Sequence, residues 1–169
     1  MELGCIFGYS GDCCKEGGDA HRERLEDWAR IIPDSGVNAK DGGGAVVVRV
    51  AEHGCFVVER GKTAVWVPSY YAPLSQEKEP GDQDGRRVID PTGAGNAFLG
   101  GFAVGLAETE SLVEALMYGA VSASLVVEQV GFPRRGVRGG VGNEVWNGVD
   151  VRERLKTFAE KVRSQLSEE

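Results

Sequence analysis

The chain has 169 residues, of which 41% are apolar and 27% are charged, and its formal net charge is −7. This composition is typical of a folded globular protein with room for one domain of ordinary size. The negative charge argues against a nucleic-acid or anionic-membrane partner, and no apolar run is long enough to span a bilayer. Residues 1–20 also lack the basic and apolar regions of a secretory signal.

Four cysteines and two histidines are present, without C-x-x-C spacing. A zinc site requires a full set of Cys and His ligands at recognisable spacing, so this chemistry is not indicated. The cysteines are expected to be reduced thiols in an intracellular protein, with Cys55 packed in a strand.

The N-terminal part of the chain is expected to begin with a poorly ordered, glycine-rich segment over residues 1–20. Apolar spacing then predicts a helix over 21–32, ended by Pro33. Residues 45–50 are a continuous β-branched run, which is typical of a buried strand in a parallel sheet.

A β-hairpin is predicted next, with strands over 56–59 and 63–67 around a turn containing Gly61. Residues 68–85 are polar and are expected to form a surface loop. Residues 86–90 are then expected to be the strand that leads into the following turn.

Three helices are predicted in the C-terminal part. The first is expected to place five apolar side chains on its core side: Phe98, Leu99, Phe102, Ala103 and Leu106. Capping-box patterns start the other two, at Ser111 with Glu114 and at Asp150 with Glu153. The second helix is expected to run to about Val130, and the basic, glycine-rich residues 134–147 are expected to form a loop.

Residues 88–102 (VIDPTGAGNAFLGGF) are the most informative segment, because they lead from an apolar run through a glycine-rich turn into an apolar helix. Such a turn aims several backbone N–H groups at one point, beside the positive end of a helix dipole, which suits a phosphate or an oxyanion. The dinucleotide fingerprint does not fit, since Phe98 stands where its third glycine would be, and there is no P-loop lysine.

This segment resembles the C-terminal signature of the PfkB family of carbohydrate kinases, D-x-x-G-A-G-D-x-F, with Asn96 in place of the second Asp. Residues 115–131 are similar to the family's small-residue helix beside the nucleotide. Residues 47–57 resemble its strand-turn-strand near the adenosine. Nothing in residues 1–44 resembles the family's sugar-binding half.

The resemblance implies an α/β fold, the C-terminal, nucleotide-side half of a ribokinase-like three-layer α/β/α sheet. The expected organisation is a poorly ordered segment over 1–20 and a partial PfkB-type kinase domain over 21–169. Such a half-domain would expose a sheet edge and apolar surface, so a protein partner or self-association is expected to cover them.

The resemblance also implies roles for individual residues. The N–H groups of Gly93, Ala94 and Gly95 would form the anion hole for the transferred phosphoryl group. Asp90 and the Thr92 carbonyl would hold a monovalent cation. The residues expected to contact the nucleotide are Gly54, Thr92, Gly119 and Ala123.

Asn96 stands at the position of the family's general base, and an amide has no useful basicity. It can orient a substrate hydroxyl but cannot deprotonate it. An alternative role for Asn96 is to cap the helix, since Asn is a favoured N-cap residue. The alternative for Asp90 is a turn residue ahead of Pro91.

The function implied is a cytoplasmic, ATP- and Mg²⁺-binding phosphotransferase domain acting on a sugar-like hydroxyl, with transfer weak or lost because of Asn96. The alternative is a non-catalytic, pseudokinase-like module for interaction or nucleotide sensing. Neither alternative has a nucleic-acid or membrane partner.

Overall fold

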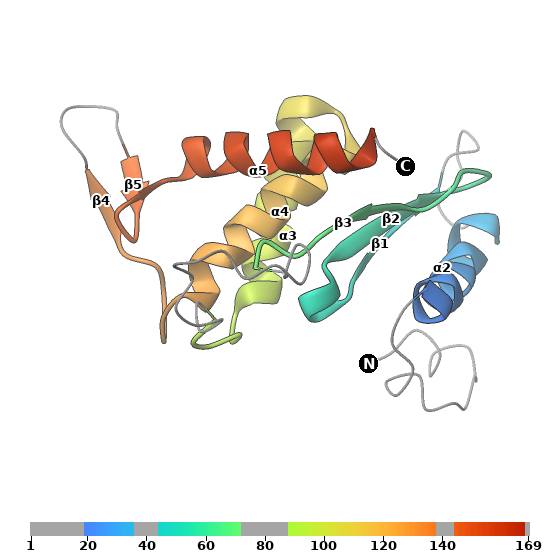
Figure 1. Ribbon diagram of the computed structural model, residues 1–169, viewed down its shortest axis with the longest axis horizontal. Coiled ribbons are helices and arrows are strands. Elements are labelled where there is room, and N and C mark those ends of the chain that lie inside the picture. Colours follow the sequence, from blue (N-terminus) through green and yellow to red (C-terminus); the bar gives the residue numbers. More distant parts are fainter. Residues whose placement is uncertain (1–18, 36–43, 72–87, 138–143, 168–169) are drawn as a thin grey trace. The chain divides into compact units, whose positions relative to one another are not determined.

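The computed structural model describes residues 19–35, 44–71, 88–137 and 144–167 (Figure 1). The chain divides into two compact units, one made of residues 1–49 and 56–66 and the other of residues 50–55 and 67–169. The segment expected to be poorly ordered lies outside the described residues except for residues 19 and 20, which begin a helix. Within the described residues, none of the helices combines the length and the apolar character needed to cross a membrane.

The first unit contains helix α2 (Asp19–Asp34), which packs against strand β1. The buried residues of α2 are Leu25, Ala29 and Pro33, which follow one another at intervals of four along one face. The helix continues past the position predicted for its end. Pro33 lacks an N–H, but the Ser35 N–H still donates to the Ile31 carbonyl at 3.1 Å, so the last turn stays closed.

The sheet of this unit has the order β1-β2-β3, with β1 at Ala45–Arg49, β2 at Cys55–Glu59 and β3 at Val65–Val67. The prediction that residues 45–50 belong to a parallel sheet is wrong. The Val50 N–H donates to the Gly54 carbonyl at 2.7 Å, and the Arg60 N–H donates to the Gly44 carbonyl at 3.0 Å, which makes β1 and β2 antiparallel. The short helix η1 (Ala51–His53) joins them and leaves no room for a parallel crossover.

The predicted hairpin of β2 and β3 is confirmed, with Gly61 in its turn at a φ of 71°. Strand β2 is central and buried, and its Cys55 is buried in the strand, as expected. Trp66 of β3 stacks on Phe56 with ring centroids 4.4 Å apart. Its indole N–H donates to Glu26 of α2 at 2.6 Å, which ties the helix to the sheet.

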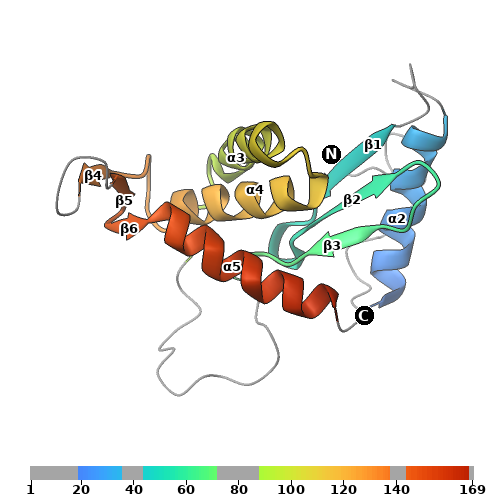
Figure 2. The ribbon, with the colours of Figure 1, turned by 90° about the horizontal axis from the view of Figure 1, so that it is seen from above.

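The second unit is built on three helices, α3 (Ala94–Thr109), α4 (Leu112–Val127) and α5 (Val151–Leu166). Helix α4 contacts both α3 and α5 and lies between them (Figure 2). Both predicted N-caps are confirmed. The Ser111 hydroxyl accepts from the Glu114 N–H at 3.4 Å, and the Asp150 carboxylate accepts from the Arg152 and Glu153 N–H groups at 2.9 and 3.1 Å.

The predicted core side of α3 is confirmed for Phe98 and wrong for Leu99, Ala103 and Leu106. Phe98 and Gly105 are the buried residues of the helix, whereas Leu99 is 55% exposed and Ala103 and Leu106 are also exposed. A Cβ at Gly105 would lie 2.9 Å from the Ala115 Cα of α4, so only glycine permits this close approach. Dense backbone contact through the glycine face therefore prevails over burial of the leucine face.

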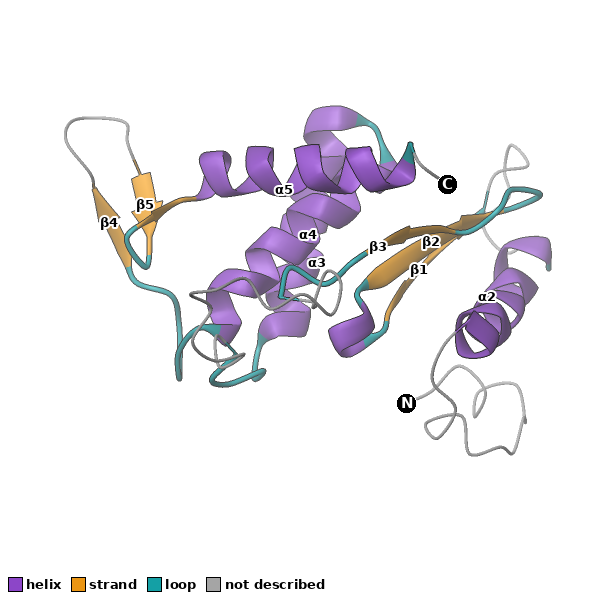
Figure 3. Ribbon diagram, in the orientation of Figure 1, coloured by secondary structure: helices purple, strands orange, loops and turns teal. Residues whose placement is uncertain are grey.

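Residues 134–147 contain strands rather than the predicted loop. Strands β4 (Arg135–Val137), β5 (Glu144–Trp146) and β6 (Val149–Asp150) form an antiparallel sheet, whose first two strands Figure 3 shows beside α5. The strand predicted over 86–90 is also not observed in its described part, residues 88–90. There the N–H groups of Ile89 and Asp90 donate to the Val127 carbonyl of α4, at 2.7 and 3.2 Å, instead of joining a sheet.

Candidate functional site

The glycine-rich turn leads directly into α3, and Gly93 is the N-cap of this helix. Gly93 has φ 86° and ψ −11°, the left-handed conformation that favours glycine. The Ala94 N–H donates to the Pro91 carbonyl at 3.2 Å, which closes the turn. The Asn96 and Ala97 N–H groups both donate to the Gly93 carbonyl, at 3.1 and 3.0 Å.

Two N–H groups of this turn remain for a ligand. Among the described residues, the structure records no hydrogen bond donated by the N–H groups of Gly93 or Gly95. The third donor assigned to the anion hole, Ala94, is already bonded to Pro91. The first turn of α3 contains no acidic side chain, so the positive end of the helix dipole is not neutralised locally.

Asn96 is the third residue of α3 and is exposed. The alternative role of helix cap is wrong, because Gly93 occupies the cap position and no side chain accepts a hydrogen bond there. Asn96 therefore lies in the first turn of the helix, directly after Gly95. It can donate or accept a hydrogen bond from that position.

Asp90 shapes the entry to the turn. Its Oδ1 accepts the Thr92 N–H at 2.9 Å. Hydrogen bonds from Thr92 lower the pKa of this carboxyl below its ordinary value. The structure thus shows Asp90 in its alternative role, a turn residue ahead of Pro91.

Helix α4 lies beside this turn. A Cβ placed at Gly93 would be 3.7 Å from Val126 Cγ1 of α4. Gly119, assigned to nucleotide contact, instead packs under Phe98: a Cβ there would lie 2.8 Å from the ring. Ala123 is partly exposed and lies between Gly119 and Val126 along the helix.

The backbone conformation and the close packing at position 54 require a glycine. Its φ of 92° and ψ of −136° favour glycine strongly, and a Cβ would lie 2.2 Å from the Val67 carbonyl oxygen. Its hydrogen bonds go to Val50 and Ala51. The structure therefore places Gly54 in the link between β1 and β2, and its recorded contacts do not join it to the glycine turn.

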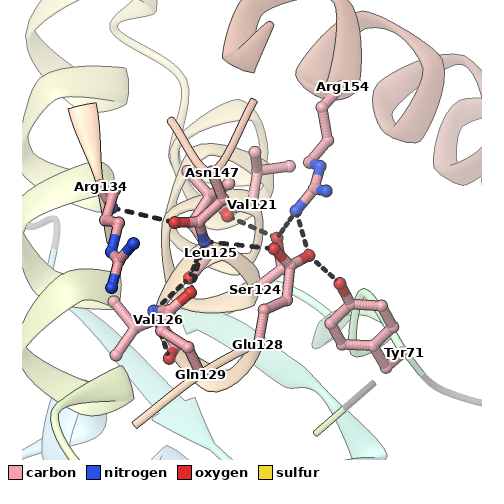
Figure 4. A network of polar contacts seen from close by, with 10 residues as sticks. All are labelled: Tyr71, Val121, Ser124, Leu125, Val126, Glu128, Gln129, Arg134, Asn147 and Arg154. Atoms are coloured by element: carbon pink, nitrogen blue, oxygen red, sulfur yellow. Dashed lines mark hydrogen bonds and ion pairs between the residues drawn. The ribbon is translucent and has the colours of Figure 1, made fainter. Parts of the chain in front are cut away.

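A polar network at the C-terminal end of α4 was not predicted from the sequence (Figure 4). Glu128 accepts hydrogen bonds from the Tyr71 hydroxyl and from Arg154 Nη1, the latter at 2.7 Å. Asn147 Nδ2 donates to the Leu125 carbonyl at 2.9 Å. The partners come from segments far apart in the chain, so local patterns could not reveal them. The one available signal was a set of charged and amide residues at the end of an apolar helix.

Burial and hydrogen bonding shift two pKa values in this network. Burial raises the pKa of the Tyr71 hydroxyl above its ordinary value, and the adjacent Glu128 carboxylate raises it further. Burial alone would raise the pKa of Glu128, but hydrogen bonds from Tyr71 and Arg154 lower it below its ordinary value. Both shifts favour a neutral phenol bonded to an ionised carboxylate.

Comparison with known proteins identifies relatives that match about half of the chain. Protein MAK32 of Saccharomyces cerevisiae is 44% identical over 72 residues, 43% of this chain and 19% of its own length. An uncharacterized protein of Schizosaccharomyces pombe is 39% identical over 77 residues, 46% of this chain and 21% of its own. Inositol 3-kinase of Arabidopsis thaliana is 34% identical over 89 residues, 53% of this chain and 21% of its own.

The matched regions span about a fifth of the length of these relatives. The sequence model of the pfkB family carbohydrate kinases matches residues 37–132, more than half of the chain. The match includes the glycine turn, α3 and α4. The helices and small antiparallel sheets are consistent with part of an α/β ribokinase-like fold. The chain belongs to the PfkB family of carbohydrate kinases.

Proposed function

We propose that the chain is a cytoplasmic PfkB-type domain that binds ATP with Mg²⁺ at the glycine turn. The observation that carries this proposal is the pair of unbonded N–H groups at Gly93 and Gly95, at the start of a helix with no acidic residue in its first turn. Donors of this kind suit phosphate oxygens. Mg²⁺ would arrive bound to the nucleotide phosphates.

The acceptor in this proposal is a hydroxyl of a sugar or related polyol, and its phosphorylation is slow or absent. Phosphoryl transfer depends mostly on positioning and on charge stabilisation, which the turn can supply. Deprotonation of the acceptor is not available from Asn96. Loss of a general base costs a factor of about 10²–10⁴ in rate.

A monovalent cation is a further part of the proposal. The Asp90 carboxylate is held at the entry to the turn by its hydrogen bond to the Thr92 N–H, and the Thr92 carbonyl lies in the same turn. Oxygen donors of this type suit a potassium or sodium ion. Tighter ATP binding in potassium than in tetramethylammonium chloride at equal ionic strength would support this role.

Calorimetric titration of the full chain with Mg·ATP tests the nucleotide site. Gly95→Asp places a carboxylate among the proposed donors and is expected to abolish binding. Gly100→Asp is the matched control, since it adds the same charge to the same helix at an exposed position with no atom within 4 Å of its Cβ. Equal binding by both variants, or no binding by the folded wild-type chain, would refute the proposal.

Transfer is tested by restoring the base with Asn96→Asp. Because one relative is an inositol 3-kinase, myo-inositol is the first acceptor to assay, followed by simple sugars. ATP-dependent phosphorylation that rises with Asn96→Asp would show that the anion hole and the acceptor site are intact. An unchanged rate with bound ATP would favour the non-catalytic alternative.

The alternative is a non-catalytic module for interaction or nucleotide sensing, and the exposed face of α3 favours an interaction with a second copy of the chain. Leu99 and Val104 are 55% and 52% exposed, with the small residues Gly100, Ala103 and Ala107 between and beside them. Large side chains beside a shallow row of small ones can fit the same surface on a second copy. Sedimentation velocity over a concentration series tests this. Leu99→Asp should abolish association, whereas Val137→Asp, on exposed β4, should not; a monomer at all concentrations excludes self-association.

A further inference from the structure

The last turn of α4 holds the chain that enters the glycine turn. The Val127 carbonyl accepts two N–H groups, from Ile89 at 2.7 Å and from Asp90 at 3.2 Å. Carbonyl groups at a helix C-terminus have no partner inside their own helix, so they are free to accept from another segment. The Asp90 carboxylate in turn accepts the N–H of Thr92, the residue before Gly93. Two hydrogen bonds therefore connect Val127 to the turn that caps α3.

Glu128 follows Val127 directly and is tied to three other segments (Figure 4). Its carboxylate accepts from Tyr71, from Arg154 of α5 at 2.7 Å and from Asn147 at 3.4 Å. The side chains of Arg154 and Glu128 are 11% and 19% exposed, so the ion pair is well shielded from water. Tyr71 is bonded to Glu128, the C-cap of α4, and Ile89 is bonded to Val127, the last residue of the helix.

A carboxylate is an unfavourable residue at this end of a helix, where the dipole favours cations. Burial adds to the cost of its charge. Arg154 offsets both effects, and it is itself held by Ser124 Oγ at 3.1 Å and by the Tyr70 ring, 5.0 Å from its Cζ. The Glu128 carboxylate is thus unfavourable with respect to the helix dipole but is fully paired. We take its hydrogen bonds to Tyr71, Arg154 and Asn147 as the reason for its presence.

We infer that Glu128 is a positioning residue for the proposed phosphate-binding turn. By fixing the last turn of α4 against Tyr71, Arg154 and Asn147, it sets where the Val127 carbonyl holds Ile89 and Asp90. The direction of the Gly93 and Gly95 N–H groups follows from that anchor. This inference rests on the proposed function, because the turn is taken to bind phosphate.

The test compares Glu128→Gln with Glu114→Gln in the full chain. Glu114 is the matched control: it also lies on α4, and it is also paired with an arginine of α5, Arg163, at 2.8 Å. Both variants remove one α4–α5 ion pair, at opposite ends of α4. Three quantities are measured: the amide ¹H–¹⁵N shifts of Ile89, Asp90 and Gly93, the dissociation constant for Mg·ATP, and the urea midpoint.

Glu128→Gln is expected to shift the turn amides and to weaken Mg·ATP binding roughly 2- to 30-fold. Glu114→Gln is expected to leave the turn amides and the affinity unchanged, even if its urea midpoint falls. Equal effects of the two variants on the turn amides would overturn the inference. If Glu128→Gln does not fold, Tyr71→Phe removes one hydrogen bond to the carboxylate, and unshifted turn amides in that variant overturn it instead.

The amide shifts are measured without nucleotide, so the positioning role of Glu128 and the proposed nucleotide site are tested separately. Shifted turn amides in Glu128→Gln, with no ATP binding by the wild-type chain, would support the anchor and refute the proposed nucleotide site. ATP binding with equal affinity in wild type and in a folded Glu128→Gln would support the nucleotide site and refute the positioning role.

Discussion

Two adjacent glycines of α3 are expected to respond to alanine in opposite directions. A Cβ at Gly100 would meet no atom within 4 Å, whereas a Cβ at Gly101 would lie 2.6 Å from the Tyr118 carbonyl oxygen of α4. It would also lie 2.7 Å from Ser122 Cβ. Both positions are in the middle of the same helix, so the intrinsic helix preference changes equally in the two variants.

The magnitudes follow from these distances. Alanine is favoured over glycine inside a helix by about 1 kcal/mol, so Gly100→Ala should raise the free energy of unfolding by that amount. In Gly101→Ala, carbon–oxygen contacts of roughly 3.3 Å require α3 and α4 to separate by several tenths of an ångström. Overpacking of this kind costs about 1–3 kcal/mol. The helix preference offsets part of it, and the net effect ranges from neutral to a loss of about 2 kcal/mol.

Urea unfolding followed by far-ultraviolet circular dichroism measures the difference directly. The free energies of unfolding of the two variants should differ by about 1–3 kcal/mol, with Gly100→Ala the more stable. The denaturant slope should be unchanged, since neither substitution alters the surface exposed on unfolding. Equal stability, or a more stable Gly101→Ala, would show that α3 and α4 do not approach as closely as described.

Three further predictions concern single residues. Hydrogen bonds from Thr92 lower the pKa of Asp90, so an NMR titration should give this carboxyl a pKa below its ordinary value. Its stabilising contribution should be present above the ordinary pKa and should disappear as the pH falls through the lowered pKa. Asp150→Ala removes the acceptor of two N–H groups and should lower the free energy of unfolding by about 0.5–2 kcal/mol in urea. Gly54→Ala should be far more destabilising than Gly61→Ala, since both have positive φ but only Gly54 is crowded; similar urea midpoints would contradict this.

Local signals in the sequence predicted local structure well. Ser111 and Asp150 are N-caps because their short side chains reach N–H groups two or three residues ahead, whatever surrounds them. Gly61 marks a hairpin turn for a similar reason, since its positive φ is a property of the turn itself. The glycine turn before α3 also follows from its own residues.

Features that depend on the partner of an element were not predictable in the same way. The apolar pattern of α3 suggested that Leu99 and Leu106 face the core, but glycines on the other face allow α4 to approach more closely. The β-branched run at 45–50 suggested a parallel sheet, but the short link to β2 permits only antiparallel pairing. Apolar composition indicates that a segment has a buried face. Which face is buried, and whether a strand pairs in parallel or antiparallel fashion, depends on the element that packs against it.

The candidate site likewise contains one part that was predictable from the sequence and one that was not. Residues 90–96 could be identified from their sequence alone because the turn and its donors lie within one short segment. The anchor at Val127 and Glu128 could not, since hydrogen bonds to Ile89, Tyr71 and Arg154 depend on the folded arrangement. If the inferred anchor is right, the geometry of the proposed phosphate-binding turn depends on residues that carry no motif.

The shape of the turn and the chemistry at position 96 are separable. Gly93 caps α3, Asp90 bonds to Thr92, and Val127 holds the entry, so the exposed Asn96 side chain is not needed for the turn. Asn96→Asp should therefore preserve the fold, and a carboxylate in the first turn of α3 should even add about 0.3–1 kcal/mol through the helix dipole. If the transfer machinery is otherwise intact, the same change should raise the rate of phosphorylation by about 10²–10⁴. A variant that is more stable yet transfers no faster, with ATP bound, would show that the missing base is not what limits transfer.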